Sequence, residues 1–133
     1  MRNIKRIILH CSATRENQDF DIKDIDRWHK EKGWNGVGYH YVIKLDGTIQ
    51  KGRDLEKVGA HCVGYNKDSI GICYIGGLDK DGNPKDTRTT QQKASMYLLV
   101  DRLKRRFPNV TIHGHNEFAN KDCPSFDVSK EYD

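Results

Sequence analysis

The stretch that decides the fold is Ile4-Lys5-Arg6-Ile7-Ile8-Leu9-His10, followed by Cys11-Ser12-Ala13-Thr14. Four large aliphatic side chains in seven positions predict a buried β-strand from Ile4 to His10. The small and polar residues that follow it predict a loop. The strand therefore ends on a histidine, which is polar although its neighbours are buried, and this histidine is the first candidate for a functional site.

Further strands are expected along the chain. The β-rich segment Tyr39–Lys44 is followed by Asp46-Gly47, a strong signal for a two-residue hairpin turn, so Thr48–Lys51 is expected to return as its partner strand. Ile70–Ile75 predicts another buried strand, and Val110–Ile112 predicts a short one. The glycine-rich and polar segments between them are expected to be irregular.

Two helices are predicted between these strands. The first runs from Asp21, a good N-cap, to Lys32 and stops at Gly33. The second runs from Thr90 to Phe107 and carries apolar side chains at helical spacing. Thr89 and Gln92 can form a capping box at its start. Strands that alternate with helices predict an α/β fold built around one mixed sheet.

Composition fits one domain, residues 1–133, of an ordinary protein of 15.4 kDa. The net charge of +4 could indicate an anionic partner, but the densest basic cluster, Arg102 with 104–106, shares a segment with an apolar helix face. We interpret it as solvated surface and expect no nucleic-acid binding. The longest apolar run has five residues, so neither an export signal nor membrane insertion is expected.

The four cysteines form no C-x-x-C pair, which argues against a closed zinc finger of the usual spacing. Without an export signal, a disulfide framework is not expected either. Cys11, Cys62 and Cys73 are interpreted as small buried side chains. Cys123 is considered separately because it follows a cluster of histidines.

Histidines stand at the ends of two predicted strands. His10 ends the first, His113 and His115 follow the last, and Cys123 comes eight residues after His115. Sites are commonly built at strand ends of α/β sheets, and two imidazoles with one thiolate suit zinc, with the fourth position left for water. From chemistry alone, unrelated surface histidines and a buried cysteine remain the alternative.

The sequence resembles the zinc-dependent N-acetylmuramoyl-L-alanine amidases of the type 2 class, which include short phage enzymes and animal peptidoglycan recognition proteins. The short phage amidases are the most similar. The matching stretches lie in the family's order over nearly the whole chain: Ile8–Thr14, Trp28–Trp34, Val37–Tyr41, Lys44–Thr48, Gly52-Arg53, Val58–His61, Gly64–Asn66, Ser69–Ile72, Gly114–Glu117 and Lys121–Asp127.

The resemblance implies a five-stranded mixed sheet with helices on both faces. It implies one zinc ion per chain, bound by His10, His115 and Cys123, and maps two catalytic positions onto Tyr39 and Lys121. It also places His61, Tyr65 and Asn66 in the groove for the peptide. His113 falls one residue too early to match the second histidine ligand, so we interpret it as a non-ligand.

The function implied is hydrolysis of the amide between the lactyl group of N-acetylmuramic acid and L-alanine of the peptidoglycan stem peptide. Two alternatives are a non-catalytic peptidoglycan-binding module and a phage inhibitor that binds a host or phage protein. The presence of Cys123 counts against the first, and the short segment before the first strand counts against the second. We expect a monomer without a separate wall-binding domain, made in the cytoplasm and acting on the wall after release.

Overall fold

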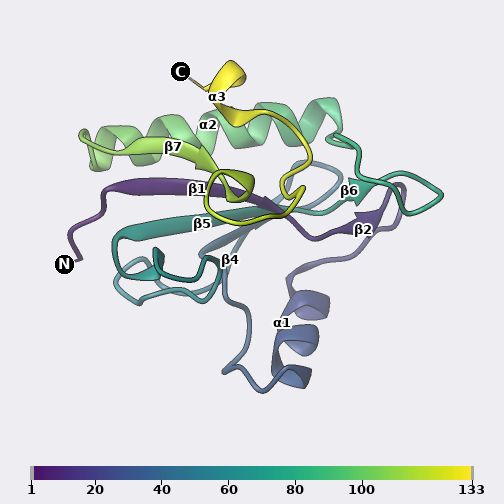
Figure 1. Cartoon of the computed structure of the whole chain (residues 1–133), viewed down its shortest axis with the longest axis horizontal. Helices are drawn as coiled ribbons and strands as arrows, with labels where there is room; N and C mark the ends of the chain where they lie inside the picture. Colours follow the sequence, from purple (N-terminus) through teal and green to yellow (C-terminus); the bar gives the residue numbers. More distant parts are fainter. Residues whose placement is uncertain (1, 133) are drawn as a thin grey trace.

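A computed structural model describes residues 2–132, so Met1 and Asp133, the two ends of the predicted domain, lie outside the described residues. A five-stranded sheet forms the middle of the molecule, in the order β4-β3-β5-β1-β7 (Figure 1). Its strands are β1 (Arg6–Cys11), β3 (Tyr41–Ile43), β4 (Ile49–Lys51), β5 (Ser69–Tyr74) and β7 (Thr111–Gly114). Only β4 runs antiparallel to its neighbour, which confirms the predicted mixed sheet.

Helices cover both faces of the sheet, as predicted. The helix α1 (Ile22–Glu31) lies on one side, while α2 (Thr90–Arg106) and the short α3 (Val128–Glu131) lie on the other (Figure 1). Both predicted caps are present: Asp21 accepts hydrogen bonds at the start of α1, and Thr89 forms a capping box with Gln92. No helix within residues 2–132 has the length and apolar composition needed to cross a bilayer.

The sequence patterns missed the short elements. Thr14, expected in a loop, begins the two-residue strand β2 (Thr14–Arg15), which pairs with β6 (Gly77–Leu78) outside the main sheet. The region from His113 onward was also expected to be a loop, but His113 lies in β7, and α3 and the 3-10 helix η2 (His115–Glu117) follow it. A second 3-10 turn, η1, covers Asn66–Asp68. Elements of two to four residues are too short to show a periodic pattern.

The alternation of side chains along β1 separates core from site. Ile7 and Leu9 pack in the cluster under α2, where Met96, Leu99 and Val100 face them. Because successive side chains of a strand point to opposite faces, His10 faces the side that carries α1. The smaller of the two apolar clusters, formed by Ile25, Val42, Cys73 and Ile75, occupies that side. The site therefore lies on the face of the sheet that carries the smaller cluster.

One buried ion pair holds the segment that follows Cys123. The Arg88 side chain is fully buried and donates to both carboxylate oxygens of Glu131 in α3, each at 2.7 Å, and to Asp86. Its guanidinium also lies 3.5 Å from the centre of the Phe126 ring. Arg88 therefore ties α3 and the loop containing Phe126 to the segment that precedes α2.

Replacing Arg88 with alanine is expected to lower the free energy of unfolding by about 3 kcal/mol, because two carboxylates lose a buried cation. Urea unfolding measures the change. Lys85→Ala is the matched control: it removes an exposed ion pair with Glu16 (3.1 Å) and is expected to cost less than about 1 kcal/mol. Equal losses in the two variants would contradict the role given to Arg88.

Candidate metal centre and active site

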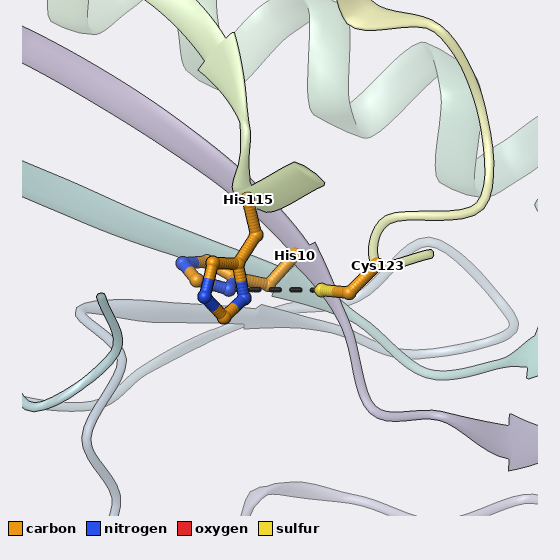
Figure 2. A group of neighbouring side chains, drawn as sticks. All are labelled: His10, His115 and Cys123. Atoms are coloured by element: carbon orange, nitrogen blue, oxygen red, sulfur yellow. Dashed lines mark hydrogen bonds between the residues drawn. The ribbon is translucent and has the colours of Figure 1, made fainter. Parts of the chain in front are cut away.

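The structure brings His10, His115 and Cys123 together from three separate parts of the chain (Figure 2). Strands β1 and β7 are parallel neighbours, with Leu9 opposite Gly114, so His10 and His115 leave the same edge of the sheet. The loop after η2 then doubles back, because the backbone N–H of Asn116 donates to the Cys123 carbonyl at 2.8 Å. This return places the Cys123 sulfur beside the two imidazoles.

The three side chains have the spacing of a metal site. One ligand atom from each lies within 4.8 Å of the others, and His10 Nδ1 is 3.7 Å from Cys123 Sγ. A nitrogen and a sulfur bound to one tetrahedral zinc ion are separated by about 3.6 Å. The donor set of two imidazoles and one thiolate also suits zinc. The cluster could therefore hold a metal ion without rearrangement of the backbone.

Burial sets the charge of these groups. Burial lowers the pKa of His10 well below its ordinary value, and it lowers the pKa of His115 to a smaller extent, so both imidazoles are neutral and able to bind a cation. The neighbouring Cys11 thiol, together with burial, raises the pKa of Cys123. The Cys11 backbone N–H points at that sulfur (3.2 Å), and a bound cation would favour its thiolate further.

A cavity of about 480 Å³ opens beside this cluster. Tyr39, His115 and Lys121 line both this cavity and a smaller neighbouring one, which Cys123 also lines. The Tyr39 ring lies 5.0 Å from the His10 ring, and burial raises the pKa of its hydroxyl, which stays protonated. Lys121 is exposed. The two predicted catalytic residues thus line the same cavity as two of the predicted ligands, His115 and Cys123.

The predicted groove residues have different surroundings. His61 is buried and is one of the residues that line the cavity, but its Nδ1 faces His10 Nε2 and its Nε2 faces Ser69. Asn66 also lines the cavity, and its Oδ1 accepts the backbone N–H groups of His61 and Cys62. Tyr65 does not line the cavity itself. Its ring packs against that of Phe118, a residue that does line the cavity, with 4.2 Å between the ring centres.

His113 lies outside the cluster. Its ring is hydrogen-bonded to Thr111 Oγ1 and to Glu117 Oε1, at 2.6 and 2.8 Å, and it is not part of the group of possible metal ligands. This position agrees with the interpretation of His113 as a non-ligand. His40, next to Tyr39, accepts a hydrogen bond from the Gly71 N–H at Nδ1 and donates one to the Lys57 carbonyl. Its ring therefore satisfies backbone groups of two neighbouring segments.

The family model described as N-acetylmuramoyl-L-alanine amidase (Amidase_2) matches residues 1–126. The chain belongs to this family. The endolysin of Enterobacteria phage K11 is 43% identical over 125 residues, which cover 94% of this chain and 83% of the phage protein. The endolysin of Escherichia phage T7 is 44% identical over 124 residues, which cover 93% of this chain and 82% of the phage protein.

A solved structure shows the same fold. The N-acetylmuramoyl-L-alanine amidase LysC from Clostridium intestinale URNW superposes with a TM-score of 0.83 at 29% identity, over 98% of this chain and 82% of LysC. Membership of the family, with these relatives, makes the chain a peptidoglycan amidase. The resemblance stated from the sequence motifs is therefore confirmed, as is the class of enzyme.

The cavity of this amidase also contains residues that received no role from the sequence, chiefly Trp34 and Phe118. The sequence did contain a signal for the position of Trp34, namely the preceding glycine. Gly33 has a positive φ of 89° directly after α1. The N–H of Gly33 donates to the Lys30 carbonyl and that of Trp34 to the His29 carbonyl, a Schellman motif that turns Trp34 back toward the site. Phe118 had no comparable signal, because its position depends on η2.

Proposed function

We propose that this amidase is zinc-dependent and hydrolyses the amide between the lactyl group of N-acetylmuramic acid and the L-alanine of the stem peptide. The supporting observation is the cluster of His10, His115 and Cys123, of which His115 and Cys123 line the smaller cavity. In this proposal these three residues bind one zinc ion per chain. The family and the phage endolysins support peptidoglycan as the substrate.

A zinc ion held by these ligands would supply Lewis-acid polarisation of the scissile carbonyl and a water molecule activated near neutral pH. The protein's own groups would act on the charge that develops during hydrolysis. Lys121 lines the cavity, and its positive charge would stabilise an oxyanion there. The protonated hydroxyl of Tyr39 can donate a hydrogen bond to the same oxygen or pass a proton to the leaving amine.

The cavity walls suit a peptide with polar and aliphatic parts. Trp34 and Phe118 offer aromatic surface, and Lys32 and Lys121 offer positive charge for carboxylate groups of the stem peptide. Aromatic surface with a few convergent polar groups is typical of ligand sites. We propose that Asn66 and the neighbouring aromatic surface contact the stem peptide, with Tyr65 acting through Phe118.

Mass analysis of products from purified peptidoglycan tests this function. The expected result is free stem peptide with an L-alanine amino terminus, together with uncut glycan strands. New reducing sugar ends would indicate a glycosidase and contradict the proposal. Binding to the wall without any release of peptide would instead support the peptidoglycan-binding module.

A further inference from the structure

A line of hydrogen bonds leads from the metal cluster into the sheet. His10 Nδ1 faces Cys123 Sγ, while His10 Nε2 lies 2.9 Å from His61 Nδ1. On the other side of the ring, His61 Nε2 lies 3.2 Å from Ser69 Oγ. All three of His10, His61 and Ser69 are buried, so water does not compete for these bonds.

One arrangement of protons satisfies this line when a cation is bound. His10 Nδ1 must then offer its lone pair to the metal, which leaves the proton of a neutral imidazole on Nε2. That proton can only be donated if His61 Nδ1 accepts it. His61 must in turn carry its own proton on Nε2, where Ser69 Oγ is the acceptor. The reverse arrangement would put a proton on His10 Nδ1 and block the metal.

The fold leaves room for the His61 ring at two glycines. A Cβ at Gly59 would lie 2.6 Å from His61 Cδ2, and a Cβ at Gly71 would lie 2.7 Å from the same ring. Neither glycine has a positive φ, so it is the space, and not the backbone conformation, that requires glycine here. His61 therefore occupies a fitted socket, and its ring has little freedom to turn away from His10.

We propose that His61 is the positioning residue of the metal site, holding His10 in the tautomer and orientation in which Nδ1 faces the metal. This inference rests on the proposed zinc site and assigns His61 a role different from the peptide contact expected from the sequence. Ser69 is the next member of the line, since it holds the proton of His61 away from His10. Such outer partners of metal ligands commonly contribute 10- to 100-fold to metal affinity, on the order expected here.

Zinc affinity, measured by competition with a chelator on the folded protein, tests the role of His61. His61→Leu is expected to bind zinc roughly 10- to 100-fold more weakly. His61→Asn places an amide oxygen near the position of Nδ1 and is expected to recover most of the affinity. Ser69→Ala is expected to lie between the wild type and His61→Leu. His113→Asn, in a histidine outside the cluster, is the matched control and should bind zinc as the wild type does.

The tautomers give a readout independent of affinity and of activity. In the zinc-loaded protein, ¹⁵N spectra of the imidazoles are expected to show both His10 and His61 protonated at Nε2. A His61 protonated at Nδ1 would overturn the proposal. So would wild-type zinc affinity in His61→Leu, or equal losses in His61→Leu and His61→Asn, since the hydrogen bond would then not be the cause.

The outcomes separate this inference from the proposed function. A wild-type protein that binds no zinc contradicts the zinc site itself and this inference with it. A wild-type protein that binds zinc, with His61→Leu binding equally well but hydrolysing poorly, overturns only the positioning role and supports the substrate contact expected from the sequence.

Discussion

Cys123→Ser is expected to lose its zinc and, with it, almost all hydrolysis of peptidoglycan. The change replaces a soft thiolate with a hydroxyl that stays protonated at neutral pH, so the site loses both charge and softness. The loss of zinc affinity is expected to exceed the roughly 100-fold that is typical of losing an outer partner of a metal ligand. Elemental analysis and product release measure the two effects.

Cys62→Ser is the matched control for zinc content, because Cys62 is also a buried thiol but is not part of the clustered ligands. It should retain one zinc ion per chain. The aromatic wall of the cavity does not depend on the Cys123 sulfur, so Cys123→Ser should still bind the wall. A Cys123→Ser protein with full zinc content and full activity would remove Cys123 from the proposed site.

Lys121→Ala is expected to keep its zinc but to lower turnover by about 100-fold or more, the usual cost of removing one group that stabilises an oxyanion. Lys121 is exposed at the cavity mouth and is not among the clustered ligands, so its loss leaves the metal site intact. Steady-state kinetics with soluble muropeptides, together with elemental analysis, separates this effect from loss of metal.

Lys93→Ala is the control for the charge change, since Lys93 is an exposed residue of α2, on the opposite side of the sheet from α1. Its turnover should match that of the wild type. If Lys121→Ala raised KM and left kcat unchanged, Lys121 would act in binding the ground state and not in stabilising the transition state.

The sequence was most informative where long patterns and caps coincide. The aliphatic run that ends at His10, the capping box of Thr89 and Gln92, and the stop at Gly33 all correspond to observed features. These signals are local, and each depends on one element. The position of His10 at a strand end was also visible, because it follows directly from the end of the apolar run.

Other parts of the site depend on contacts between distant segments and had no local signal. The partnership of His10 with His61 spans 51 residues, and that of Arg88 with Glu131 spans 43. The resemblance placed His61 in the groove for the peptide, and in the structure its two ring nitrogens face His10 and Ser69. The packing of the Tyr65 ring against Phe118 depends on η2, which is too short to predict.

The most direct test of the zinc site is a crystal structure of the protein, purified without chelator, with anomalous data collected on both sides of the zinc absorption edge. The account predicts one anomalous peak per chain, within bonding distance of His10 Nδ1, one ring nitrogen of His115 and Cys123 Sγ. No zinc peak, or one coordinated by other residues such as His113 and Glu117, would contradict the account.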